Sequence, residues 1–80
     1  MTATTKIAIN IGLPNKHRKY YLPTDLTVNH AIAIAEREDA QLCEEVQRGA
    51  VVVTINGELV EDYHDIPLSH GQVITLVHHN

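Results

Sequence analysis

Several residue types are scarce in this chain of 80 residues: it has no Trp or Phe and only one cysteine, Cys43. A single cysteine excludes an internal disulfide and any zinc site built from several thiolates. It is typical of a reducing compartment, which predicts a cytoplasmic location. The first residues lack the long apolar run of a signal peptide, and no stretch approaches the roughly 18 apolar residues of a membrane span, so no membrane partner is expected.

An excess of basic residues is also absent, because the formal net charge is −4. Proteins that bind nucleic acids usually carry a basic surface, so no nucleic acid is expected as a partner. The chain contains no Gly-rich phosphate loop, Ser/His/Asp arrangement or paired-carboxylate signature. We therefore expect neither a free-standing enzyme nor a bound cofactor.

Apolar residues make up 44% of the chain, which is enough for a folded domain rather than a disordered chain. We expect a single domain over residues 1–80, with residues 1–5 disordered. A chain of this size buries only about 60% of its unfolded surface, which leaves little stability for a large internal pocket. Because Trp and Phe are missing, Ile, Val, Leu and Ala must form the core.

The N-terminal part has the pattern of a β-hairpin. In residues 6–11, KIAINI, isoleucine occupies every second position, which is typical of a half-buried strand. The following segment, GLPNKHRK, contains Gly, Pro and Asn residues that favour turns. An extended pattern returns at residues 20–22. Residues 6–22 are therefore predicted to form a hairpin with a fairly long loop.

The middle of the chain has a helical pattern. Thr27 is the expected N-cap of a helix, because its hydroxyl can accept a bond from a free backbone N–H. Apolar residues follow at the i, i+3, i+4 and i+7 spacing of one helix face: Val28, Ala31, Ile32 and Ala35. A second helical piece is expected over residues 40–48, ending at Gly49, since glycine tolerates the left-handed conformation after a helix.

The C-terminal part is predicted to contain three strands. Residues 51–55, VVVTI, are all β-branched and predict a well-buried strand. The pair Asn56-Gly57 predicts a tight hairpin turn, since both residues tolerate a positive φ. A short return strand follows over residues 58–60, and a polar loop then leads to a last strand over residues 73–77.

In this order, the elements are those of the β-grasp or ubiquitin-like fold. The fold class implied is α+β, with a mixed sheet of four or five strands and one main helix packed on it. The segment VVVTINGELVEDYHDIPLSHGQVITLV resembles the C-terminal half of the small sulfur carriers of thiamine and molybdopterin synthesis. The residues that carry the resemblance are Val51–Ile55, Asn56-Gly57-Glu58, Pro67-Leu68 and His70-Gly71-Gln72. The same pattern also occurs in the TGS domains of synthetases and stringent-response enzymes.

The resemblance implies a function as a protein substrate. A partner enzyme adenylates the last carboxylate of such a carrier, which becomes a thiocarboxylate and gives its sulfur to a synthase. These carriers end in Gly-Gly, a tail without side chains that can enter a narrow active site. Here His78-His79-Asn80 stands about where that tail would begin. Three interpretations stay open: a truncated chain, a protein that kept the fold and lost the chemistry, or another β-grasp branch.

Two other functions are compatible with the same fold. The first is a non-catalytic ubiquitin-like adaptor or small subunit that binds a larger protein through its sheet face. The second is a TGS-like regulatory or RNA-contacting module, which the net negative charge disfavours. The residues expected to contact a larger protein lie in the C-terminal strands, the loop between them and the tail: Leu59, Val60, Leu68, Val77, His78, His79 and Asn80.

A basic cluster stands out against the negative net charge. Lys16, Arg18 and Lys19 are three of the six Lys and Arg residues, and they fall in the predicted hairpin loop. A basic loop could dock an acidic partner or a phosphate group. The simpler interpretation is a solvated turn, since exposed charges usually contribute little free energy.

The histidines and the cysteine are further candidates for chemistry. His64 and His70 lie in one predicted loop, where a metal site with Asp62 or Asp65 is conceivable. Their spacing does not supply the three ligands of a catalytic zinc site, so no metal is predicted. Cys43 precedes two glutamates, whereas reactive thiolates need positive surroundings, and a packing role in the helix is therefore expected.

Overall fold

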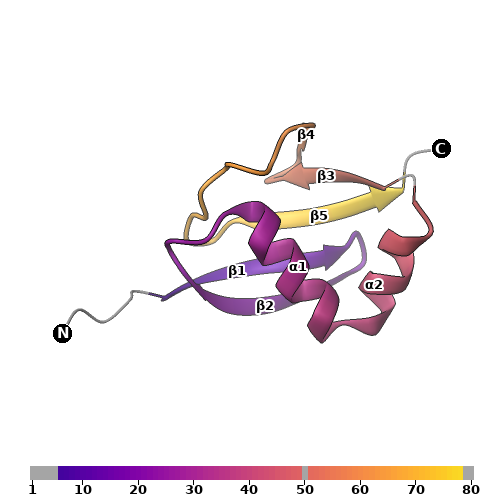
Figure 1. Cartoon of the computed structure of the whole chain (residues 1–80), viewed down its shortest axis with the longest axis horizontal. Coiled ribbons are helices and arrows are strands. Elements are labelled where there is room, and N and C mark those ends of the chain that lie inside the picture. Colours follow the sequence, from indigo (N-terminus) through magenta and orange to yellow (C-terminus); the bar gives the residue numbers. More distant parts are fainter. Residues whose placement is uncertain (1–5, 50, 79–80) are drawn as a thin grey trace.

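The computed structural model describes residues 6–49 and 51–78, which form an α+β fold of five strands and two helices (Figure 1). In chain order the elements are β1 (Lys6–Leu13), β2 (Lys16–Pro23), α1 (Val28–Glu38), α2 (Ala40–Gln47), β3 (Val51–Ile55), β4 (Glu58–Val60) and β5 (Val73–His78). The α+β class is confirmed, but one main helix is too simple a description because α2 follows α1 directly. Residues 1–5, for which disorder is expected, lie outside the described residues.

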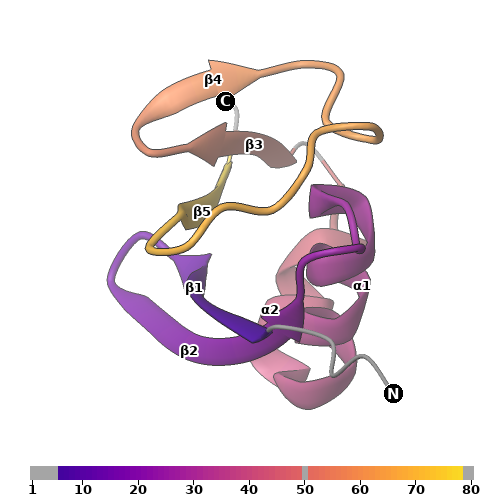
Figure 2. The same cartoon turned by 90° about the vertical axis from the view of Figure 1, so that its left-hand side faces the viewer.

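The sheet is mixed, as predicted, and has the strand order β2-β1-β5-β3-β4. Strands β1 and β5 run parallel at its centre, while the other neighbouring strands are antiparallel. The first and last strands of the chain therefore lie side by side. Figure 2 shows both helices on the same side of the sheet, so one face is covered and the opposite face is open among the described residues.

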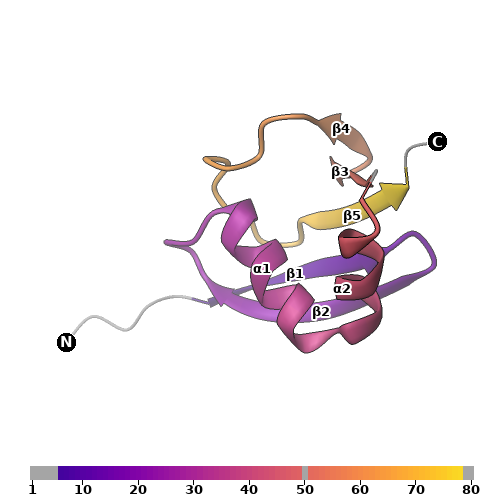
Figure 3. The same ribbon diagram turned by 45° about the vertical axis from the view of Figure 1, so that its right-hand side comes forward.

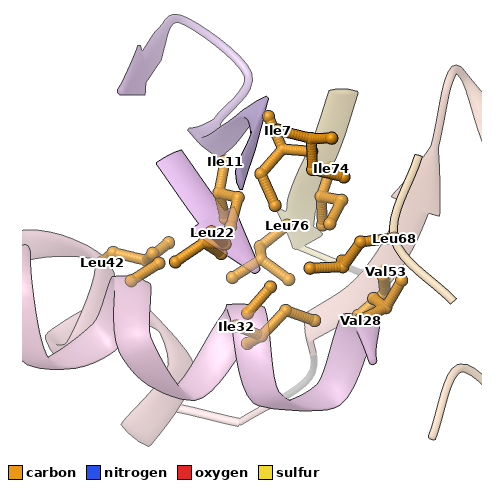
Figure 4. Packing of buried hydrophobic residues seen from close by; sticks show 13 residues of the cluster. Ile7, Ile11, Leu22, Val28, Ile32, Leu42, Val53, Leu68, Ile74 and Leu76 are labelled. Carbon is orange, nitrogen blue, oxygen red and sulfur yellow. The ribbon is translucent and has the colours of Figure 1, made fainter. Parts of the chain in front are cut away.

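A core of aliphatic side chains fills the space between the helices and the sheet (Figure 4). The isoleucines of β1 are buried, as their alternation predicts, and so is the predicted apolar stripe of α1. The other buried hydrophobic residues are Leu22, Leu42, Val53, Leu68, Ile74 and Leu76. Burying one large aliphatic side chain contributes about 1.5–3 kcal/mol relative to exposure, so this cluster is the main source of stability.

The turn between β1 and β2 is shorter than the sequence predicts. Leu13 pairs with Lys16, so the turn consists of two residues and the fairly long loop is a wrong prediction. The segment KHRK has no β-branched or aromatic residue, yet it forms a strand because its backbone pairs with β1. Lys16, Arg18 and Lys19 therefore lie on strand β2 rather than in a loop.

The two helices are separated by one residue, Asp39, which ends α1 and caps α2. Its backbone N–H donates to the Ala35 carbonyl at 2.9 Å. Its carboxylate accepts bonds from the backbone N–H groups of Gln41 and Leu42. These bonds satisfy a buried carboxylate and two free donors at the start of α2. Thr27 precedes α1 as its N-cap, as predicted.

The turn between β3 and β4 is the predicted tight hairpin. Asn56 and Gly57 have φ angles of 52° and 87°. The Asn56 Oδ1 atom also accepts a 2.9 Å hydrogen bond from the backbone N–H of Val73, the first residue of β5. Asn56 therefore shapes the turn and fixes it to the neighbouring strand.

Replacing Asn56 with valine is expected to lower the free energy of unfolding by about 2 kcal/mol. A β-branched residue is strained at positive φ, and the bond to β5 is lost. Urea denaturation measures the loss. In the control Asn56→Gly, the turn geometry is kept and only the side-chain bond is lost, so we expect about half the effect. Equal stability of Asn56→Val and the unmodified chain would contradict this role.

Candidate protein-docking surface

The open face of the sheet is set by the register of its strands, because side chains alternate along each strand. On β3, Val53 faces the core, whereas Val52 and Thr54 face the open side. Val52 pairs with Val77 of β5, and Thr54 pairs with Thr75. The sequence predicts a well-buried β3, but this alternation leaves only Val53 buried.

Three apolar residues gather on the open face where β5, β3 and β4 adjoin. Val52 and Val77 are half-buried, and Leu59 on β4 is 62% exposed. Leu59 pairs with Thr54, which lies on the same face as Val52 and two residues from it along β3. We call Val52, Leu59 and Val77 the open-face patch. A single exposed leucine is common, but neighbouring apolar residues exposed together often mark a protein interface.

A groove of about 380 Å³ adjoins the open-face patch. Its lining comes from β3, β4 and the loop after β4: Val51, Val52, Val53, Leu59, Val60, Glu61 and Tyr63. Strand β4 pairs only with residues 53–55 of β3, so the start of β3 extends beyond it. Apart from Glu61, the side chains around the groove are apolar or aromatic, which suits an aliphatic side chain of a partner.

The residues expected to contact a partner are separated by the fold. Leu59 and Val77 belong to the open-face patch, and Val60 lines the groove. Leu68 is only 7% exposed and belongs to the core, so it is not available to a partner. Val52 is a member of the open-face patch that is not among the residues expected to contact a partner. Its only signal in the sequence is the polar Thr54 two residues later, which lies on the same face of β3.

The C-terminal end of β5 lies near α2 (Figure 3), and a side-chain bond joins the two elements. The His78 imidazole bonds to one carboxylate oxygen of Glu45, and the other oxygen lies 3.5 Å from the guanidinium of Arg48. His78 therefore faces the helix side of the sheet, opposite to the open-face patch. His79 and Asn80, the other tail candidates, lie outside the described residues.

The basic cluster of β2 is divided between the two faces of the sheet. Arg18 points to the helices, where its Nε lies 3.7 Å from the Asp39 carboxylate and its Nη1 donates to the Glu38 carbonyl at 3.3 Å. Lys19 pairs with Asn10 and faces the open side. Because Arg18 is about half exposed, its ion pair contributes at most about 1 kcal/mol. A binding role for the cluster stays a prediction.

Tyr20, also on β2, has a buried hydroxyl without a hydrogen-bond partner among the described residues. Burial raises the pKa of this hydroxyl; the Arg18 charge lowers it, and the Asp39 and Glu38 charges raise it. A raised pKa means that the folded state favours the protonated form. The resulting stability is fully present below the usual pKa of 10.0 and is lost as the pH rises through the raised value.

The remaining polar candidates make contacts within the fold. His64 stacks on Tyr63 with ring centroids 5.1 Å apart, and the His70 Nδ1 atom accepts a bond from the Ala8 N–H at 3.3 Å. Cys43 is half-buried on α2. In the part of the chain that the structure describes, no group of three or more His, Cys, Asp or Glu side chains is placed to hold a metal ion.

Comparisons with known proteins do not identify a family: no family model matches the chain, and no curated protein matches it. Within residues 6–49 and 51–78, no helix has the length and apolar character needed to cross a membrane. The features that bear on function are therefore the open-face patch, its groove and the residues that carry the resemblance to the sulfur carriers.

Proposed function

We propose that the chain adopts the β-grasp fold and acts as a sulfur-carrier-like protein, a small protein substrate or partner of an adenylating enzyme in cofactor biosynthesis. The strand order, with β1 and β5 parallel at the centre and the helices on one face, supports this fold. The turn at Asn56-Gly57, the short strand after it and the loop anchored by Leu68 support the resemblance to the carriers.

The open-face patch is the observation that carries the proposal. Val77 lies on β5, the last strand, and Val52 is its neighbour on β3. An enzyme that acts beyond the end of β5 must bind the folded domain in one orientation, because the reacting group has to be positioned accurately. The exposed Leu59 gives such an enzyme an apolar anchor near this strand.

Replacing Leu59 with aspartate is expected to weaken binding to the adenylating enzyme by at least about tenfold, because a charged side chain would replace the apolar anchor. Leu59 is largely exposed, so the free chain should keep its stability. Calorimetric titration of the enzyme from the same organism measures the affinity. Ala33→Asp is the matched control, since Ala33 is an exposed apolar residue of α1 and lies on the other side of the sheet from the open-face patch.

Carrier chemistry needs a separate test with the full-length natural chain, the adenylating enzyme, ATP and a sulfur donor. We expect pyrophosphate release that depends on the chain. Mass spectrometry should then show that the C-terminal carboxylate has become a thiocarboxylate. Unchanged binding by Leu59→Asp would exclude the open-face patch as the anchor, whereas binding without pyrophosphate release would exclude the carrier chemistry.

A second candidate function is a non-catalytic ubiquitin-like adaptor or small subunit, which the groove beside the open-face patch favours. Groove and patch together could hold a larger protein without any reaction at the end of the chain. Binding of a larger protein that depends on Leu59, with no pyrophosphate release, would support the adaptor over the carrier.

A further inference from the structure

Strand β2 has a free edge within the described part of the chain, since it is the outermost strand on its side and pairs with β1 alone. Even-numbered residues of β1 bond in the direction of β5: the Asn10 N–H donates to the Gln72 carbonyl at 2.9 Å, and the Gly71 N–H donates to the Ala8 carbonyl at 2.8 Å. The odd-numbered residues of β1 therefore bond to β2. In the pairing of the two strands, each odd-numbered residue of β1 lies opposite an even-numbered residue of β2. The backbone groups of these even-numbered residues therefore bond to β1.

The backbone N–H and C=O groups of His17, Lys19 and Tyr21 consequently point outward. Among the described residues, these three form no backbone hydrogen bond outside the strand pairing. Pro23 occupies the next outward position, where its missing N–H is tolerated because no strand pairs there. An outward row of unpaired donors and acceptors is a template to which a further strand can add.

The charge of this edge indicates what kind of strand it can accept. Strand β2 contains Lys16, His17, Arg18 and Lys19 and no acidic residue, in a chain of net charge −4. Arg18 is directed to Asp39, whereas Lys16 and Lys19 are exposed and form no ion pair with other described residues. Two such edges would repel each other, so an acidic segment is favoured over a second copy of the chain.

Tyr21 adds an apolar contact at the same edge. Its side chain is 64% exposed and lies on the open face, as does that of Lys19 two residues earlier. Cross-strand neighbours on one face contact each other directly. An added strand would therefore place a carboxylate near Lys19 and an apolar side chain near the ring of Tyr21.

We propose that the outer edge of β2 is a docking strand for an extended acidic segment of a partner protein. The segment adds beside β2 through the outward backbone groups of His17, Lys19 and Tyr21, and its carboxylates lie near Lys16 and Lys19. This docking edge is separate from the open-face patch, because β2 and β4 are the opposite edges of the sheet. Either surface can therefore fail its test without affecting the other.

A peptide titration followed by NMR tests the proposal. The probe is an acetylated and amidated peptide as long as β2, in which Glu and Thr residues flank a single Ile. We expect slower amide exchange at His17, Lys19 and Tyr21, no change at Leu59, and an affinity that falls with added salt. The same peptide with Lys in place of Glu should not bind. Unprotected β2 amides at saturating peptide would overturn the proposal.

Lys19→Pro is the most direct test, because it removes one outward backbone N–H from β2. Proline is tolerated at such a position, since Pro23 already occupies another outward position of the same strand. It is expected to weaken peptide binding by at least about tenfold. If it does not fold, the double variant Lys16→Glu with Lys19→Glu should cause a similar loss through charge repulsion. Arg37→Glu, on the exposed side of α1, is the charge control and should bind normally. Strand addition by an acidic segment would be refuted if a folded Lys19→Pro chain bound the peptide with the affinity of the unmodified chain. It would also be refuted if the free chain dimerised through β2.

Discussion

Replacing Ile11 with alanine should lower the free energy of unfolding by about 3–4 kcal/mol, one of the largest effects expected for a single substitution. Ile11 is fully buried and pairs in register with the equally buried Ile74 across the parallel contact of β1 and β5. Alanine would leave a cavity between the sheet and the helices. A domain of 80 residues has a total stability of about 4–12 kcal/mol, so the variant would keep little of it.

Urea denaturation followed by circular dichroism measures this loss as a lower midpoint. Ile11→Val is the matched control, because it removes less volume and should cost about 1 kcal/mol. Leu59→Ala, at an exposed position, should change the stability by less than about 0.5 kcal/mol. If Ile11→Ala lowered the free energy of unfolding no more than Leu59→Ala does, the placement of Ile11 in the core would be wrong.

The buried faces of this fold are predictable from the sequence because they depend on local spacing. The alternating isoleucines of β1 and the apolar stripe of α1 need only the geometry of a strand and a helix, and both are buried as expected. The turn at Asn56-Gly57 is predictable for a similar reason, since few residue pairs accept two successive positive φ angles.

Local spacing does not reveal which segments pair or where a loop runs. The sequence predicts a loop in the first half of β2, because KHRK has a low strand preference and only pairing with β1 makes it a strand. Leu68 is a surface candidate in the sequence, yet the loop around it is held against the start of α1. Thr27 forms a bridge with Pro67, and the Val28 N–H donates to the Ile66 carbonyl at 2.9 Å. These contacts turn Leu68 into the core.

The candidate docking surface is only partly predictable for the same reason. Leu59 and Val77 are recognisable as strand residues, but the only local sign that Val52 faces away from the helices is the polar Thr54 two residues later, and threonine is also common on buried faces of strands. The register with β5 decides this, and it also turns His78 toward Glu45 and off the open face. A surface built from three strands depends on the strand order, which no local pattern contains.

Replacing Gly12 with alanine is expected to lower the free energy of unfolding by about 3 kcal/mol, because the position has no room for a Cβ atom. A Cβ there would collide with the Lys16 carbonyl oxygen and would lie 2.8 Å from the His17 Cα. These are backbone atoms of a paired strand, which can move only if the hairpin opens. Urea denaturation compares this variant with Gly57→Ala, where nothing lies within 4 Å and only the positive φ opposes the change, so about 1–2 kcal/mol is expected.

The Gly12→Ala substitution should also impair the docking edge of β2, because Lys16 and His17 belong to that strand. Displacing their backbone would shift the outward amides, so the acidic peptide should bind at least about tenfold more weakly even where the variant is still folded. Gly57→Ala, at the other edge of the sheet, should bind the peptide normally. A Gly12→Ala chain with unchanged stability and peptide affinity would show that β1 and β2 do not approach as closely as the contact at Gly12 requires.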